Sequence, residues 1–230
     1  MIRTAVTGDC RLITLDRPQR RNALTPSGLD ALDDAIRDAD EPVLYLTGAG
    51  DAFCAGADLD VVAELTEDDA AEFARRGQAV ARALTEYNGA VVAGIDGPAR
   101  GGGVELALAC DIRLATGEAS FAETGVKLGL FGAWGGTARL PRIVGVGEAM
   151  DIALSGRTIA AETALRMGLV SRIVDDPRAV AQSIAANDAA TLRVIKQRLR
   201  DDADRETQER REAAAFAERI AAFDSENRNG

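Results

Sequence analysis

The chain has 230 residues and a mass of 24.1 kDa, enough for one large domain or two small ones whose core needs no disulfides or metals. With 47% hydrophobic and 28% charged residues, its composition excludes disordered and collagen-like proteins. The net charge of −10 argues against nucleic acid or an anionic membrane as the main partner. No apolar run approaches the ~20 residues of a membrane span, and the N-terminus lacks the layout of a signal peptide, so we expect a cytoplasmic protein.

Histidine and cysteine usage narrows the possible chemistry. The absence of histidine excludes Ser-His-Asp and Cys-His nucleophile systems and histidine-ligated metal sites. Cys10, Cys54 and Cys110 are odd in number and widely spaced, which fits neither a disulfide framework nor a zinc cluster, so we expect buried thiols and no metal site. Acid–base chemistry must therefore come from carboxylates, lysine, tyrosine or backbone groups.

The basic residues are strongly biased towards arginine. Of the 27 basic residues, only Lys127 and Lys196 are lysines. An acidic chain poor in lysine and rich in arginine resembles proteins of salt-loving microbes with GC-rich genomes. This hypothesis about the source predicts that the protein loses its fold at low salt.

The predicted elements alternate between strands and helices along most of the chain. The expected strands are residues 43–47, 90–95, 112–115 and 170–174, together with a short run within residues 6–15 that ends at Leu15. The expected helices are residues 27–39, 68–86, 104–110, 147–154 and 160–167. From Pro177 onward the sequence is helical, charged and alanine-rich. The pattern predicts an α/β core over residues 1–176 and a C-terminal helical region over residues 177–230.

The C-terminal region carries two apolar stripes at helical spacing. Their members are Leu192, Ile195 and Leu199 in one stripe, and Phe216, Ile220 and Phe223 in the other. Because the upstream segments already supply a core, we expect these stripes to be buried between subunits.

Two glycine loops each follow a buried strand and lead into helical sequence. They lie at residues 55–58 and 101–105, and neither fits the dinucleotide or P-loop pattern. Free N–H groups from two such loops can form an oxyanion hole, although the spacing fits plain tight turns equally well. Glu105 begins a predicted helix, where the helix dipole favours an acidic residue. In dry surroundings beside an anion site, the same carboxylate can act as a general base.

Several motifs carry a resemblance to a known family. The two longest are residues 46–59, LTGAGDAFCAGADL, and residues 95–111, IDGPARGGGVELALACD. Shorter matches lie at residues 15–18, 21–24, 128–130, 135–142 and 164–170. These segments, in this order, resemble the enoyl-CoA hydratase/isomerase (crotonase) superfamily over essentially the whole chain.

The resemblance implies a crotonase-like spiral of ββα units with a C-terminal helical region that builds trimers or dimers of trimers. The substrate would be an acyl group held as a coenzyme A thioester, with no separate cofactor. The N–H groups of Ala57 and Gly102 would form the oxyanion hole, and Glu105 matches the first catalytic glutamate. Residues expected to contact the substrate or its CoA moiety are Ala23, Leu24, Ala55, Asp58, Gly101 and Trp134, the last being equally suited to structural packing.

The sequence departs from the family pattern at the second catalytic glutamate. That position, between Phe121 and Gly129, holds Gly125. Glu123 lies two residues earlier, where an extended backbone points its side chain to the same side, so it is our candidate for the missing carboxylate. An ordinary solvated loop residue is the alternative interpretation.

The expected activity is reversible hydration of a 2-enoyl-CoA in fatty acid metabolism. A Δ3,Δ2-enoyl-CoA isomerase that uses Glu105 alone, or a catalytically weak acyl-CoA-binding homologue, stays open. The C-terminal region also looks shorter than in most of the family, so we expect coverage of CoA and assembly to differ.

Overall fold

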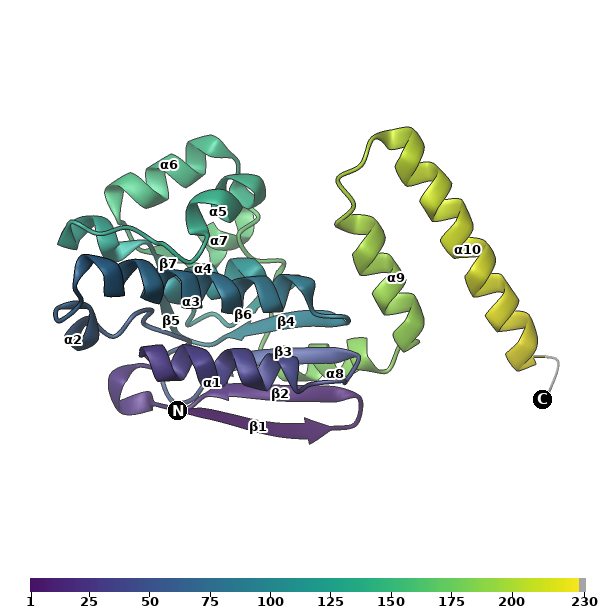
Figure 1. Cartoon of the computed structure of the whole chain (residues 1–230), viewed down its shortest axis with the longest axis horizontal. Helices are drawn as coiled ribbons and strands as arrows, with labels where there is room; N and C mark the ends of the chain where they lie inside the picture. Colours follow the sequence, from purple (N-terminus) through teal and green to yellow (C-terminus); the bar gives the residue numbers. More distant parts are fainter. Residues whose placement is uncertain (228–230) are drawn as a thin grey trace.

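A six-stranded sheet forms the centre of the computed structural model, which describes residues 1–227 (Figure 1). Its spatial order is β1-β2-β3-β4-β6-β9, with β1 and β2 antiparallel and the remaining neighbours parallel. The strands are β1 (Ile2–Thr7), β2 (Cys10–Leu15), β3 (Val43–Gly48), β4 (Ala90–Ile95), β6 (Ile112–Ala115) and β9 (Arg172–Ile173). Parallel neighbours need crossover connections, which the intervening helices supply.

Different helices cover the two faces of this sheet. They are α1 (Pro26–Arg37), α3 (Glu67–Glu86) and α4 (Gly102–Ala109) on one face and α8 (Pro177–Ala185) on the other. In β3, Leu44 and Leu46 belong to the first cluster, whereas Val43 and Tyr45 belong to the second. This alternation follows from the two-residue period of a strand, so β3 is buried on both faces.

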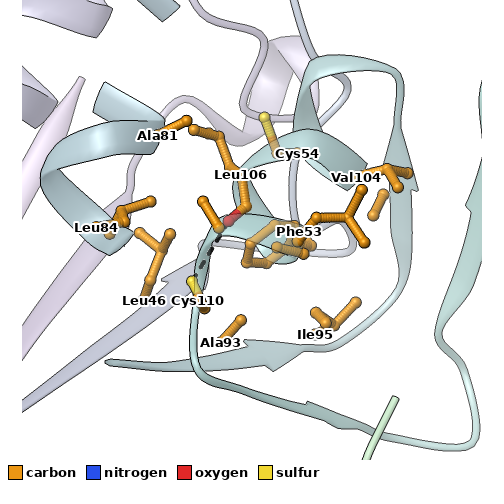
Figure 2. Packing of buried hydrophobic residues seen from close by; sticks show 14 of the residues in the cluster. Leu46, Phe53, Cys54, Ala81, Leu84, Ala93, Ile95, Val104, Leu106 and Cys110 are labelled. Atoms are coloured by element: carbon orange, nitrogen blue, oxygen red, sulfur yellow. Dashed lines mark hydrogen bonds between the residues drawn. The ribbon is translucent and has the colours of Figure 1, made fainter. Parts of the chain in front are cut away.

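The predicted burial of the three thiols is confirmed. Cys10, Cys54 and Cys110 are all buried and form no disulfide. Figure 2 shows Cys54 and Cys110 inside the larger apolar cluster, around Leu106. Burial raises the pKa of both of these thiols to about 12, so they are inert packing residues at neutral pH.

A second, smaller sheet creates the spiral. Its strands are β5 (Pro98–Arg100), β7 (Ser120–Ala122) and β8 (Ile159–Ala160). One ββα unit consists of β4, β5 and α4, and a second consists of β6, β7 and α5 (Gly136–Val144). An isolated bridge between Cys54 and Ala99 brings the loop after β3 beside β5. The predicted crotonase-like α/β fold is therefore confirmed.

Most predicted elements match the observed ones to within two residues, and the exceptions have physical reasons. The short strand predicted within residues 6–15 is observed as β2, which ends at Leu15 as expected. Strand β1 was not predicted, and Gly8, with φ +56°, turns the chain between β1 and β2. The strand predicted over residues 170–174 contracts to β9. Strands of two or three residues are too short to show alternation, so the second sheet was not predicted. Helix α5 was also missed, since Pro141 lies inside it.

The remaining helices lie mainly around the site and at the C-terminus. They are α2 (Leu59–Val62), α6 (Val146–Ser155), α7 (Ala161–Arg166), α9 (Ala189–Leu199), α10 (Arg205–Asn227) and the 3₁₀ turns η1 (Pro18–Arg20) and η2 (Thr124–Leu128). Within residues 1–227, no helix combines the length and apolar character needed to cross a membrane.

Helices α9 and α10 form a two-helix arm, in which α9 contacts β4 and pairs with Asp111 through Lys196, and α10 stands away from the sheet (Figure 1). The turn between them is tied by Asp201, which pairs with Arg198 at 2.9 Å and with Arg211 at 2.8 Å. A common groove on this arm is lined by Ile195 and Leu199 of the first predicted stripe and by all three residues of the second. Leu199 and Phe216 are 82% and 67% exposed. The expectation for Leu192 is wrong, because this residue packs against the smaller core cluster of its own chain. The division of the chain after residue 176 stays a prediction, and its last residues, 228–230, lie outside the described part.

Candidate active site

The two glycine loops predicted from the sequence lie directly against each other. Arg100 N donates to Cys54 O at 2.9 Å, and a methyl group placed on Gly56 would lie 2.9 Å from Gly102 N. Gly56 has φ +85°, so glycine is required there by both conformation and space.

The N–H groups of Ala57 and Gly102 are available for a ligand. An isolated β-bridge pairs Leu24 with Ala57. In this bridge Leu24 N donates to Gly56 O and Asp58 N donates to Leu24 O, so the N–H of Ala57 itself is not used. Gly102 N opens α4, where the first N–H groups have no intrahelical acceptor. Neither N–H has an acceptor among residues 1–227.

Glu105 lies in the first turn of α4, as predicted, and its carboxyl group is buried with 1% exposure. Its Oε1 accepts hydrogen bonds from Trp134 N at 2.9 Å and Gly136 N at 2.6 Å. A methyl group on Gly136 would lie 2.8 Å from that oxygen, so the tight turn before α5 needs glycine. Burial raises the pKa of Glu105, and the two N–H groups oppose this rise.

Arg139 holds the turn that contacts Glu105. Its Nη1 donates to Trp134 O at 3.2 Å, and its guanidinium occupies the space where a side chain on Gly135 would lie. The positive charge of Arg139 also helps to lower the pKa of Glu105. Sequence reasoning missed this residue and the N–H groups of Trp134 and Gly136, because it missed the start of α5.

The indole of Trp134 is a packing element in this structure. It lies against Gly77 and Gly102 and meets Phe73 edge to face, with ring centroids 5.8 Å apart and an interplanar angle of 85°. The side chain therefore packs against the glycine loop that contains Gly102, while its backbone N–H donates to Glu105. A direct contact with substrate stays a prediction.

Glu123 is a second buried carboxyl group in the same region. Its side chain has 8% residue exposure, and its Oε1 has no hydrogen-bond partner among the described residues. Burial and, secondarily, the charge of Glu105 raise the pKa of Glu123 to about 8. This carboxyl group is therefore mainly protonated at neutral pH, unlike that of a solvated loop residue.

The backbone around Gly125 leaves little room for a side chain. Leu130 N donates to Gly125 O at 2.9 Å, and a methyl group on Gly125 would lie 3.0 Å from Leu130 O. The backbone at Leu130 therefore lies against Gly125, the position at which the resemblance places the second glutamate.

An apolar cavity of about 370 Å³ begins at Glu123. Gly132 and Gly136, which both contact Glu105, line the same cavity. Its other lining residues are Gly125, Val126, Leu130, Phe131, Thr137, Leu140, Pro141, Val146, Ala149, Met150, Ala153 and Leu154. Apart from Gly125, the sequence analysis singled out none of these wall residues, because they come from η2, α5, α6 and the loop between η2 and α5.

A hollow of about 350 Å³, which we call the polar hollow for the charged residues in its wall, is lined by residues of the first glycine loop and of the segment before α1. Of the predicted CoA contacts, Ala23, Ala55 and Asp58 line it, together with the oxyanion candidate Ala57. Its remaining lining residues are Gln19, Arg20, Arg21 and Leu59. Two further predicted contacts do not line it. They are Leu24, whose side chain is buried, and Gly101, which caps α4.

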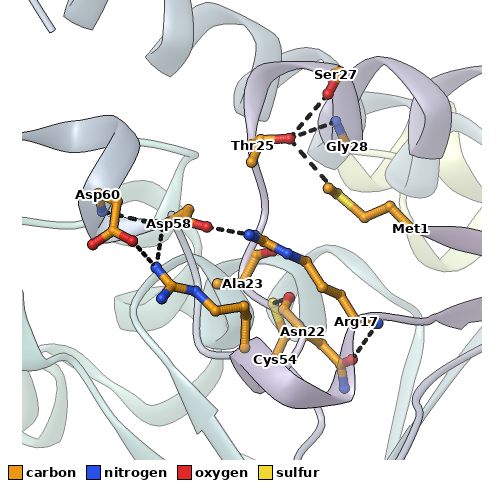
Figure 3. A network of polar contacts seen from close by, with 11 residues as sticks. Met1, Arg17, Asn22, Ala23, Thr25, Ser27, Gly28, Cys54, Asp58 and Asp60 are labelled. Atoms are coloured by element: carbon orange, nitrogen blue, oxygen red, sulfur yellow. Dashed lines mark hydrogen bonds and ion pairs between the residues drawn. The ribbon is translucent and has the colours of Figure 1, made fainter. Parts of the chain in front are cut away.

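Ion pairs fix the wall of this hollow (Figure 3). Asp58 pairs with Arg17 and with Arg20, the latter at 3.1 Å, and its Oδ1 accepts from Asp60 N at 3.1 Å. Burial acts to raise the pKa of Asp58, but the hydrogen bonds from both arginines outweigh it and hold the pKa below its usual value. Arg21 lines the hollow without forming an ion pair to any described residue.

Comparisons with known proteins agree with this geometry. The family model described as enoyl-CoA hydratase/isomerase matches residues 7–227. The short-chain-enoyl-CoA hydratase of Clostridium acetobutylicum is 35% identical over 201 residues, which are 83% of this chain and 77% of that protein.

Solved structures are similar over almost the whole chain. An enoyl-CoA hydratase from Bacillus anthracis has a TM-score of 0.89 at 31% identity and covers 98% of this chain and 96% of its own. A Thermobifida fusca protein solved in complex with CoA has a TM-score of 0.87 at 31% identity, with 97% and 94% covered.

Proposed function

Because the chain belongs to the enoyl-CoA hydratase/isomerase family, we propose that it is an enoyl-CoA hydratase, which reversibly adds water across the double bond of a 2-enoyl-CoA ester. The observation that carries this proposal is a pair of buried carboxyl groups, Glu105 and Glu123, beside two unengaged N–H groups. Hydration needs a base and a proton donor, and this pair offers one carboxylate held by N–H groups and one carboxyl group that is protonated at neutral pH.

In this mechanism the N–H groups of Ala57 and Gly102 bind the thioester oxygen. Addition of water at the β-carbon moves negative charge onto that oxygen, giving an enolate. Donors already aimed at the developing charge stabilise the transition state, each by about 3 kcal/mol.

The two glutamates divide the proton transfers. Glu105 accepts a proton from the attacking water with the oxygen that the two N–H groups leave free. Glu123 then gives its proton to the α-carbon of the enolate. One water has been added, and the proton gained by Glu105 and lost by Glu123 returns through solvent or a direct exchange.

The two spaces beside the loops suit the two ends of the substrate. Arg20 and Arg21 at the polar hollow supply guanidinium groups for the CoA phosphates. The apolar cavity beyond Glu123 would receive the acyl group. The similar T. fusca protein was solved in complex with CoA, which supports a CoA ester as the ligand by analogy.

Two alternatives differ in what they require. A Δ3,Δ2-enoyl-CoA isomerase needs only one glutamate, but the hydratase names of the relatives do not favour it. A catalytically weak acyl-CoA-binding homologue would bind esters without turnover. A site that only binds would not need a buried carboxyl group without a hydrogen-bond partner, so Glu123 argues against this alternative.

The test uses purified protein and crotonyl-CoA in high salt, following the ultraviolet absorbance of the conjugated thioester and the mass of the product. Loss of absorbance with a gain of one water supports hydration. A double-bond shift without a mass change would indicate the isomerase. Tight binding with no turnover of any enoyl-CoA ester would leave the binding homologue.

We further propose that the protein acts in the cytoplasm as a trimer or dimer of trimers. The exposed Leu199 and Phe216 on the α9–α10 arm are the sort of apolar surface that association buries. Light scattering across a salt series would test both this assembly and the proposed dependence on salt.

A further inference from the structure

Helix α6 has an apolar stripe that lines the cavity, with only Ala149 of the stripe also belonging to the hydrophobic core. Val146, Ala149, Met150, Ala153 and Leu154 all line the cavity, at the i, i+3, i+4, i+7 and i+8 spacing of one helix face. Val146, Met150 and Leu154 are 63%, 56% and 70% exposed. These three large side chains therefore mark the outer end of the cavity, where it meets the surface.

The inner end of the cavity is where the reacting carbons would lie. Glu123 lines it directly, and Gly132 and Gly136 connect its wall to Glu105. Between this end and α6, the only polar side chain in the lining is Thr137. A tail that carries a carboxylate or several hydroxyl groups would lose its hydration here without finding partners, whereas a hydrocarbon tail would not.

The size of the cavity exceeds what a short acyl group can fill. An engineered apolar cavity of about 150 Å³ admits benzene, a six-carbon ring. The cavity here, at about 370 Å³, is more than twice as large, whereas crotonyl-CoA would place a single methyl group in it.

We propose that α6 makes the enzyme selective for linear, apolar acyl chains of eight or more carbons, whose tails run from Glu123 along Met150, Ala153 and Leu154. The proposal rests on the proposed function for the position of the reacting carbons. Continuity of the cavity with both glutamates favours the substrate tail over a second copy of the chain as the occupant of this stripe.

The first experiment measures kcat/KM for 2-enoyl-CoA esters from four to twelve carbons. Each buried methylene adds binding in the transition state, so kcat/KM is expected to rise about fourfold per carbon and to level off once the tail reaches α6. Calorimetric Kd values for the saturated acyl-CoA esters of the same lengths report on the cavity without any turnover and are expected to fall in parallel.

The second experiment fills the outer cavity with Ala153→Trp. Ala153 is exposed, so the fold tolerates the larger side chain, which a melting curve checks. We expect the ratio of kcat/KM for the ten-carbon ester to that for the four-carbon ester to drop at least tenfold. Glu148→Trp, on the same helix but outside the cavity, is the matched control and should leave this ratio unchanged.

The outcomes separate the two proposals. Turnover that is flat with chain length, or best at four carbons, would overturn the chain-length inference and leave the hydratase intact. Absence of turnover together with Kd values that fall with length would remove the hydratase but keep the apolar acyl site. A change of oligomeric state in Ala153→Trp with no change in chain-length profile would assign the stripe to a second copy instead.

Discussion

The polar hollow and the apolar cavity are lined by different residues, and a buried carboxyl group has the opposite ionisation in each of them. In the hollow, Asp58 is buried but satisfied by Arg17 and Arg20, so its carboxylate stays ionised and holds the loop. In the cavity, Glu123 is buried without a partner, so its pKa rises to about 8. Structural carboxylates are paired, whereas a carboxyl group left unpaired in a dry site keeps a proton that chemistry can use.

The strongest test of the cavity side is Glu105→Gln. The amide oxygen can still accept from Trp134 and Gly136, but it cannot take a proton from water, so we expect kcat to fall about 10³-fold. Steady-state hydration assays measure this loss, and Kd for a saturated acyl-CoA ester should be unchanged. A variant that keeps a tenth of the activity would show that Glu105 is not the base.

The next largest effect is expected from Glu123→Gln. Its proton is needed at the α-carbon, so we expect kcat to fall about 10²-fold. In the wild type, activity should decline as the pH rises through about 8, because Glu123 loses its proton there. Glu118→Gln, at an exposed residue five positions earlier, is the control. An unchanged alkaline limb in the Glu123 variant would assign the decline to another group.

A smaller effect is expected from Arg139→Met. This change releases Trp134 O and removes a positive charge that lowers the pKa of Glu105. We expect kcat to fall about tenfold, and the acid limb of the pH profile to move to higher pH because Glu105 must be ionised to act. Arg142→Met removes an exposed charge about one helical turn after Arg139, at a residue that does not make this hydrogen bond. An equal shift in that variant would point to general electrostatics.

The smallest expected effects are on thermal stability. Removing the buried carboxyl group should raise Tm in the apolar cavity and lower Tm in the polar hollow. The pKa of Glu123 rises from 4.5 to about 8 on folding, so its protonation favours the native state at low pH and that advantage is lost as pH rises through this window. Glu123→Gln should therefore raise Tm relative to wild type, more at pH 9 than at pH 5.

Asp58 has a lowered pKa, so its contribution to stability is present at neutral pH and is lost in acid. Asp58→Asn should lower Tm at pH 7 by about 2–4 °C. Thermal melts across pH test both, and equal signs would refute the contrast.

The sequence predicted those parts of the fold and site that depend on local pattern. Glu105 and the two glycine loops follow strands with clear periodicity, so their positions in the chain could be identified from the motifs. The turn at Trp134–Gly136 could not, because its role depends on reaching Glu105 from 29 residues away, and Pro141 hides the helix that follows. Glu123 was identified from the two-residue spacing, but only burial against distant elements reveals its raised pKa.

The turn at Asp201 between α9 and α10 affects how the α9–α10 arm would bind another subunit. Asp201 forms ion pairs with Arg198 and Arg211, and its carbonyl oxygen accepts a hydrogen bond from Gln208 Nε2 at 2.7 Å. These contacts from both helices fix the angle between α9 and α10. An arm held in this way has already lost its hinge entropy when the chain folds. Each encounter between copies then meets a surface of defined shape, and less of the association energy goes into ordering it.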